Sequence, residues 1–214
     1  MRTIPREVCL SQKVNFSLNH TQKCVLVGTL LGDGCIQLHG KNARLHIKHS
    51  LHQLPLVSYK HSIFSDITSM NVRTFSQKVG KKDYKFAEFV TRTHSEFTDY
   101  YRLFYPSFKK IIPSNIQTLL TDPLSLAVWI MDDGAAEYAG LSIQTHSFTV
   151  SDIDLLREVI LGTFKLKTLR RKNRGSWIIY FPKESLDSLR KLISDHTLLE
   201  FMYKLEPYSL RQTP

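Results

Sequence analysis

The sequence predicts an α+β protein (α/β mixed) built from two pseudo-symmetric αββαββα repeats, in which paired central helices are flanked by antiparallel sheets that form a saddle. Two observations lead to this fold class. The nonapeptides Leu26–Gly34 and Leu126–Gly134 are both apolar and both end in Asp-Gly. The patterns that follow them also match in kind and order, and self-similarity of this sort is the mark of a repeated structural unit.

The first repeat continues with patterns that change from period two to helical spacing. Alternation of polar and apolar residues predicts a half-buried strand at Arg44–Lys48. A helix is predicted at 53–65, a basic hairpin at 72–90 around Gly80, and a closing helix at 95–104.

The second repeat shows the same succession. We expect a strand at Leu141–Thr145, and then a helix that Ser151 caps and that runs to Phe164. Asn173-Arg174-Gly175 favours positive φ and therefore predicts a tight turn. The remaining predicted elements are the hairpin strands within 167–181 and a closing helix at 184–193.

The two repeats are expected to form one compact unit over residues 1–214. The connection 105–122 contains Pro106 and Pro113 but no Gly/Ser-rich or charged linker. We place the N-terminal half at 18–107 and the C-terminal half at 108–207.

The charge balance indicates a polyanionic partner. Lysine and arginine number 29 against 19 acidic residues, a formal charge of +10, which favours nucleic acid. The apolar run Cys24–Leu31 is much shorter than the ~20 residues that a bilayer requires, so we expect no membrane partner. The first residues lack an apolar core, which predicts no signal or transit peptide.

Cysteine usage argues against structural crosslinks. Cys9, Cys24 and Cys35 are odd in number and form no CxxC pair, so neither a disulfide framework nor a structural zinc site is expected. His46, His49 and His52 are spaced by three, but side chains on a strand that leads into a helix do not converge, and we expect no zinc site there.

The two aspartates at the motif ends are candidate metal ligands. Asp122 can cap the second motif helix, Pro123 suits its first position and Gly134 suits a left-handed exit. Asp33 and Asp133 then lie at helix C-termini, where a carboxylate is disfavoured by roughly 0.3–1 kcal/mol unless a cation compensates. A divalent cation held by both carboxylates would remove this penalty and suit phosphodiester hydrolysis.

The same nonapeptides allow a simpler interpretation, in which each is an ordinary core helix with an Asp-Gly exit. Two copies in matching contexts favour the functional interpretation. Gly28 and Gly32 lie one turn apart and remove side-chain bulk, so that a second helix can approach closely. The partner helix offers Ala127 but also Val128 and Asp132, so close packing is better supported on the first helix.

The paired motifs and their surroundings, from about Leu18 to Pro207, resemble those of LAGLIDADG homing endonucleases. Three segments are similar to those of a yeast mitochondrial intron-encoded member of this family: Leu126–Gly134, Gln144–Thr149 and Phe201–Leu205. The sixth motif position, aspartate in the family name, is Leu31 and Met131 here. The resemblance implies a site-specific endonuclease that makes double-strand breaks in a long DNA target.

The resemblance also implies the site residues. The eighth motif position, the metal-binding carboxylate, falls on Asp33 and Asp133, and the preceding position, which contributes a backbone carbonyl, falls on Gly32 and Asp132. The expected cofactor is Mg²⁺, with Mn²⁺ as an alternative.

Two lysines beside the scissile phosphates are implied in the same way. They fall on Lys110 and Lys204, with Lys109 as a rival to Lys110. Each lysine could stabilise charge that develops on the phosphate. We expect a monomer, because a pseudo-symmetric chain with both motifs can supply both halves itself. By family habit, the expected setting is a bacterial cytoplasm or the interior of an organelle such as a mitochondrion or chloroplast.

Double-stranded DNA would lie on the polar faces of the two sheets, because two-stranded ribbons can follow a major groove. Ser142 is the expected counterpart of the first strand's polar residues. The candidate DNA-binding residues are polar or basic and lie on the strands and hairpins: Arg44, His46, Lys48, Arg73, Lys78, Lys81, Lys82, Lys85, Gln144, Lys167, Arg170, Arg171, Lys172 and Arg174, with Lys165 beside them.

Two other functions remain open at this stage. An RNA-binding intron maturase would use the same basic saddle. A DNA-binding regulator without cleavage would keep the fold, but a pure binder has no use for carboxylates that face phosphates, and Asp33, Asp133, Lys110 and Lys204 are all present.

Overall fold

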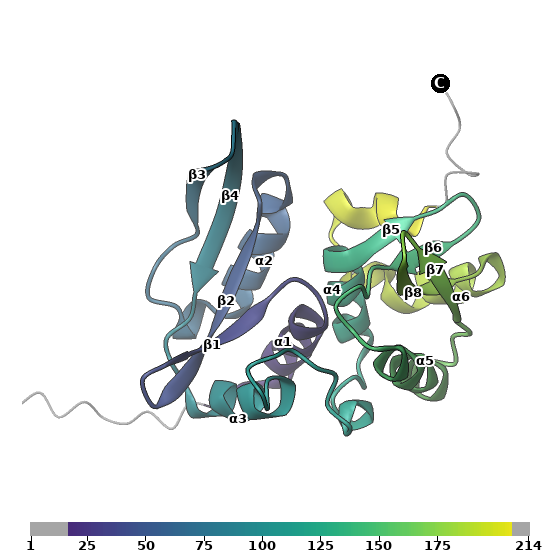
Figure 1. Ribbon diagram of the computed structural model, residues 1–214, viewed down its shortest axis with the longest axis horizontal. Coiled ribbons are helices and arrows are strands. Elements are labelled where there is room, and N and C mark those ends of the chain that lie inside the picture. The colour runs from purple at the N-terminus through teal and green to yellow at the C-terminus, as the bar shows by residue number, and fades with distance from the viewer. Residues whose placement is uncertain (1–16, 207–214) are drawn as a thin grey trace, which may run out of the picture.

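The computed structural model describes residues 17–206, whose elements follow the order αββαββα twice (Figure 1). The N-terminal repeat consists of α1 (His20–Leu31), β1 (Cys35–His39), β2 (Asn42–Ser50), α2 (Leu54–Ile63), β3 (Arg73–Val79), β4 (Lys82–Val90) and α3 (Ser95–Phe104). The C-terminal repeat consists of α4 (Pro123–Asp133), β5 (Gly134–Ala136), β6 (Leu141–Ile143), α5 (Val150–Phe164), β7 (Leu169–Asn173), β8 (Ser176–Phe181) and α6 (Lys183–Ile193). A 3₁₀ helix, η5 (Leu199–Leu205), follows α6. The expectations about the first residues, Cys9 and Pro207 lie outside the described part of the chain.

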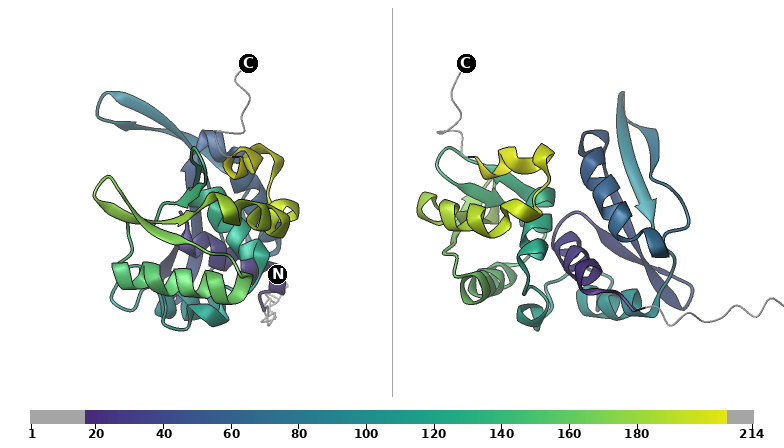
Figure 2. Two further views of the ribbon diagram at one scale, coloured as in Figure 1. Left: turned by 90° about the vertical axis from the view of Figure 1, so that its right-hand side faces the viewer. Right: turned by 180° about the vertical axis from the view of Figure 1, so that it is seen from behind.

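Each repeat contains one four-stranded antiparallel sheet, and the two sheets have the same order. The strands run β1-β2-β4-β3 in the first and β5-β6-β8-β7 in the second. The registers begin with Cys35 opposite His46 and Gly134 opposite Ile143. Seen along the long axis of the molecule, the β3–β4 and β7–β8 hairpins project to the same side (Figure 2). The predicted α+β class and repeat order are therefore confirmed.

The centre of the molecule is the contact between α1 and α4, which lie side by side between the two sheets (Figure 1). Both helices are buried over most of their length. A β-carbon at Gly28 would lie 2.8 Å from Cβ of Val128, and one at Gly32 would lie 2.6 Å from Cβ of Asp132. The expected close approach therefore occurs at both glycines, with Val128 and Asp132 as the facing residues.

The start of α4 agrees with the sequence prediction, but its end differs. Asp122 is the N-cap, its Oδ1 accepts from the Leu124 amide at 2.8 Å, and Pro123 follows it. Gly134 has φ −70° and ψ 142°, so it is extended rather than left-handed. The chain passes directly into β5, and glycine is required here for space, because a β-carbon would lie 2.8 Å from Cγ2 of Ile130.

The ends of the other elements match the predictions closely, with one correction. The N-cap of α5 is Thr149, which forms a capping box with Asp152, and Ser151 lies inside the helix. In the β7–β8 turn, Arg174 and Gly175 have φ of 48° and 88°, as the turn chemistry predicted. Within the described residues, no helix has the length and apolar character needed to cross a bilayer.

The packing of α1 against α4 gives a stability prediction. Gly28→Ala places a methyl group against Val128 and the Ser125 carbonyl, and overpacking of this kind costs roughly 1–3 kcal/mol. Gly162→Ala in α5 is the matched control, because a β-carbon there meets no atom within 4 Å and the change should stabilise the helix by up to about 1 kcal/mol. Urea unfolding would measure both. Equal stability of the two variants would contradict the close approach of the helices.

Candidate catalytic and nucleic-acid-binding site

Asp33 and Asp133 lie where the two central helices end. Asp133 is the last residue of α4, and Asp33 follows Gly32, the C-cap of α1. The Asp33 side chain is 48% exposed, whereas Asp133 is half-buried. Because α1 and α4 pack along their length, the two carboxylates lie close enough that the charge on Asp33 raises the pKa of Asp133.

At the C-terminal end of each of α1 and α4, a lysine ammonium group donates hydrogen bonds to backbone carbonyls. Lys110 donates from Nζ to the carbonyls of Gly32 at 2.7 Å and Gly34 at 3.2 Å. Lys204, from η5, donates to the carbonyls of Met131 at 2.5 Å and Asp132 at 3.0 Å. These cations compensate the partial negative charge of the helix C-termini. Burial lowers the pKa of both lysines, and the neighbouring aspartates oppose that shift.

The two carboxyl groups are not electrostatically equivalent. Burial, followed by the charges of Asp33 and Asp132, raises the pKa of Asp133 to about 8. A hydrogen bond from His49 holds the pKa of Asp33 below its usual range. The Asp133 carboxylate therefore has the greater need of an additional cation.

Asp132 joins the two halves through a buried ion pair. Its carboxylate lies 2.6 and 2.8 Å from the Nζ of Lys60, and both side chains are fully buried. The Asp33 amide also donates to Asp132 Oδ2 at 3.4 Å. His49 lies between the two acids, with Nδ1 3.4 Å from Asp33 Oδ2 and Nε2 3.6 Å from Asp132 Oδ1. Residues of α2 and β2 thus support the end of α4 across the repeat interface.

One face of the first sheet carries the polar residues expected to meet DNA. Arg44, His46 and Lys48 alternate on β2 with buried residues. Arg73 lies opposite Glu88 in the register and forms a salt bridge with it, and Glu88 also lies 3.2 Å from His46. We call the sheet face that carries Arg44, His46, Lys48, Arg73 and Glu88, with its counterpart on the second sheet, the saddle face. Lys48 stacks over Phe86 and Phe75 on the same face.

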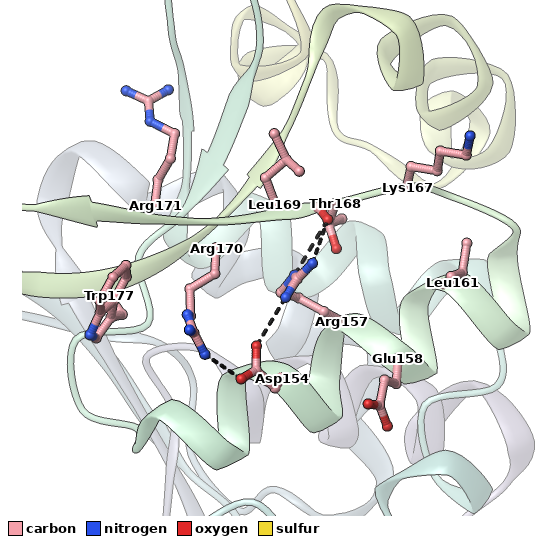
Figure 3. A pocket seen from close by; sticks show the side chains of 10 residues that line it. All are labelled: Asp154, Arg157, Glu158, Leu161, Lys167, Thr168, Leu169, Arg170, Arg171 and Trp177. Carbon is pink, nitrogen blue, oxygen red and sulfur yellow. Dashed lines mark hydrogen bonds and ion pairs between the residues drawn. The ribbon is translucent and has the colours of Figure 1, made fainter.

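The strand registers divide the hairpin residues between two faces. In the second sheet, Ser142 and Arg171 lie on the saddle face, where Ser142 is buried and Arg171 pairs with Glu137 at 3.0 Å. Arg170 points to the opposite, helix-facing side (Figure 3). The register places Lys172 on the same side as Arg170. Arg170 forms a salt bridge with Asp154 there.

The first hairpin is divided in the same way. Lys82 lies on the saddle face, whereas Lys78 and Lys85 lie on the helix-facing side. Hence only part of the predicted basic set faces the saddle. The remaining candidates lie outside the strands. Lys81 and Arg174 are in the hairpin turns, Gln144 directly follows β6, and Lys165 and Lys167 lie between α5 and β7.

The chain is similar to known proteins in both sequence and fold. The model of the LAGLIDADG DNA endonuclease family matches residues 23–189. The chain belongs to this family. It is 30% identical to the cytochrome b mRNA maturase bI2 of Saccharomyces cerevisiae over 89% of its length, although it spans only 48% of that protein. It is 35% identical to the intron-encoded endonuclease ai4 of Dictyostelium discoideum, over 58% of this chain and 79% of that protein.

The fold is also that of a solved LAGLIDADG protein. The structure of the homing endonuclease I-WcaI bound to its DNA recognition sequence matches with a TM-score of 0.83 and 22% identity, over 90% of this chain and 88% of that one. The family name describes DNA-cleaving enzymes. This agreement confirms the family resemblance and the fold inferred from the two nonapeptides.

The arrangement distinguishes the two lysine candidates next to the first LAGLIDADG motif. Lys110 contacts the end of α1, whereas Lys109 is exposed. His46 and His49 alternate on opposite faces of β2, so they do not form a common site. The structure therefore brings together Asp33, Asp133, Lys110 and Lys204.

Sequence reasoning missed Lys60 and the position of His49. A signal for Lys60 was present, because Leu56 and Lys60 share one face of α2 at spacing i, i+4, and Leu56 is buried. A charged residue on a buried face requires a partner. The seventh motif position, glycine in the first copy and aspartate in the second, supplies that partner.

The residues at the LAGLIDADG helix ends fit a hard divalent cation. Such ions prefer carboxylate and carbonyl oxygens, and Asp33, Asp133 and the carbonyls of Gly32 and Asp132 provide them. The carbonyls already accept from two ammonium groups, so their orientation suits positive charge.

The buried ion pair between Lys60 and Asp132 gives a second prediction. Lys60→Met leaves Asp132 as an uncompensated buried charge, which costs roughly 3–5 kcal/mol. In an Asp132→Asn background the same change should cost much less, because no charge is stranded. Urea unfolding of the wild type, both single variants and the double variant measures the difference. Lys191→Met, at an exposed site on α6, is the control. Additive losses would show that the two side chains do not interact.

The raised pKa of Asp133 gives a third prediction. In the unfolded chain the carboxyl group ionises near its ordinary pKa, whereas in the folded protein it holds its proton up to about pH 8. Its contribution to stability is therefore complete below the unfolded pKa and is lost as pH rises through 8. In chelator, the Tm of the wild type should fall relative to that of Asp133→Asn between pH 5 and 8.5. A constant difference across this range would contradict the shift.

Proposed function

We propose that this chain is a site-specific homing endonuclease that makes metal-dependent double-strand breaks in a long DNA target. The observation that carries the proposal is the pair of carboxylates at the adjacent ends of α1 and α4, where a lysine ammonium group contacts the carbonyls of each helix end. Two equivalent constellations in one chain suit the cutting of two strands. We further propose that the halves, residues 18–107 and 108–207, act together in a monomer.

Asp33 and Asp133, with the carbonyls of Gly32 and Asp132, would hold Mg²⁺ or Mn²⁺. When bound, such an ion activates water and stabilises the leaving oxygen of the phosphodiester. Lys110 and Lys204 are each anchored at a helix end, and there they can stabilise negative charge that develops on a scissile phosphate. His49 and Lys60 are positioning residues, because they contact Asp33 and Asp132 rather than the saddle face.

The partner would be double-stranded DNA along the saddle face. Arg44, His46 and Lys48 in the first half and Gln144 and Arg171 in the second are its proposed contacts. Phosphate contacts would fix the register and a few side chains would read bases. The intron-bearing DNA of an organelle or of a bacterium is the expected setting.

An RNA-binding maturase function is a second candidate. The relative from S. cerevisiae is named an mRNA maturase. The helix-facing side of the β7–β8 hairpin provides a second surface, where a hollow is lined by Arg157, Lys167, Arg170 and Trp177 (Figure 3). Asp154 and Glu158 also line it, and Asp154 forms ion pairs with both arginines. Arginine and tryptophan side chains suit stacking on single-stranded bases. A regulator that only binds DNA would not need the Asp33 and Asp133 carboxylates at the helix ends.

Selection for cleavage from a randomised double-stranded DNA library with Mg²⁺ tests the proposal. We expect recovery of one long site that the wild type cuts. Asp33→Asn and Asp133→Asn should lose cleavage by several orders of magnitude and keep DNA binding, because each removes a proposed metal ligand. Asp99→Asn, at an exposed site on α3, should cut normally.

The lysines provide an internal control in the same assay. Lys110→Ala should slow cleavage by about 10²-fold or more, whereas Lys109→Ala should cut like the wild type. No cleavage together with tight binding to structured RNA would move the assignment to the maturase function. Cleavage by both aspartate variants would remove the proposed centre.

A further inference from the structure

Three metal-binding side chains meet at the N-terminal ends of α1 and α4. His20 is the first residue of α1, Cys24 lies one turn later, and Asp122 is the N-cap of α4. The imidazole, thiol and carboxylate ligand atoms all lie within 4.8 Å of one another. The cluster is at the opposite end of the helix pair from Asp33 and Asp133, which corresponds to about 15 Å along an eleven-residue helix.

We propose that His20, Cys24 and Asp122 form a second metal site, which takes zinc or a similar borderline-soft divalent ion and ties the two halves together. The inference is independent of the proposed nuclease function. The absence of a CxxC pair argued against a zinc site built from cysteines that are neighbours in the sequence. The present ligand set is of another kind, because Asp122 comes from the other repeat and meets His20 and Cys24 only in the folded chain.

The distances suit tetrahedral coordination. Zinc bonds of ~2.0 Å to nitrogen and ~2.3 Å to sulfur would separate these two ligand atoms by about 3.6 Å. The distance between His20 Nε2 and Cys24 Sγ is 3.5 Å. His20 Nε2 and Asp122 Oδ2 are 2.8 Å apart, and they would need to separate by about 0.5 Å to reach zinc geometry. The His20 side chain is 76% exposed, so its ring can make this small movement.

A metal would leave undisturbed the contacts that hold one oxygen of Asp122 and the backbone of Cys24. It would have to displace the thiol proton of Cys24, because burial and the charge of Asp122 raise the pKa of this thiol to about 11. Asp122 Oδ1 accepts from the Leu124 amide, which leaves Oδ2 for the cluster. Cys24 is buried in the helix interface, and Ser125 Oγ donates to its carbonyl at 2.9 Å. The cluster combines a buried thiol with an exposed imidazole, so solvent can supply a fourth ligand on the side of His20.

The ligand set selects a different class of ion from the cleavage centre. Thiolate and imidazole ligands favour zinc, cobalt and related metals, whereas oxygen-only sites favour Mg²⁺. An ion here would join residues of α1 to the cap of α4 and would therefore stabilise the packing of the two halves.

Titration of the full-length protein with Co²⁺ alone tests the proposal, because cobalt bound to a thiolate gives an intense near-ultraviolet charge-transfer absorption. We expect one equivalent with this absorption, and a rise in Tm when Zn²⁺ replaces Co²⁺. Cys24→Ala and His20→Ala should abolish the absorption. Asp122→Asn should weaken binding by at least tenfold, yet it keeps an N-cap residue and therefore the helix start.

Matched controls separate this site from the rest of the chain. Cys9→Ala and Cys35→Ala should keep the absorption, as should Asp33→Asn and Asp133→Asn, whatever their effect on DNA cleavage. Thermal unfolding in chelator establishes that each variant folds. An absorption spectrum without the thiolate band in the wild type, or a band that persists in folded Cys24→Ala, would overturn the proposal.

Discussion

The close contact between α1 and α4 is the constraint on which the rest of the structure depends. Gly28 and Gly32 leave no side chain between the helices, so Val128 and Asp132 pack directly against the α1 backbone. This contact fixes the relative position of two sheets that share no strand. It also brings two helix C-termini together, and with them Asp33 and Asp133. Architecture and candidate chemistry therefore arise from the same pair of glycines.

The negative charge at this interface is balanced by lysines from several elements of the structure. The terminal carbonyls of two helices and three aspartate carboxylates place negative charge in a small volume. Lys110 and Lys204 occupy the carbonyls, and Lys60 neutralises Asp132. Burial, together with the charges of Asp33 and Asp132, raises the pKa of Asp133 to about 8, whereas a hydrogen bond from His49 lowers that of Asp33. A site that is short of one positive charge is suited to an ion that arrives from solution.

Much of the fold could be predicted because local patterns and global architecture agree. The duplicated nonapeptide, the alternation at Arg44–Lys48 and the Arg174-Gly175 turn each specify an element that forms. The site was predictable where the motif repeats, at Asp33 and Asp133. Where the repeats differ, the sequence indicates only that Lys60, on the buried face of a helix, needs a partner. The contacts of Lys60 with Asp132 and of His49 with Asp33 form only in the folded chain. Gly134 was misjudged because steric crowding by Ile130, rather than positive φ, requires glycine.

The ion pair between Lys60 and Asp132 makes the interface between the two halves chemically asymmetric. If the C-terminal half were expressed as a symmetric homodimer, two Asp132 carboxylates would face each other across the two-fold axis without a counter-ion. A homodimer of the N-terminal half would bury two Lys60 ammonium groups beside two glycines instead. Each half is therefore complementary to the other half and not to a second copy of itself, so the asymmetry of one buried ion pair specifies which surfaces can meet.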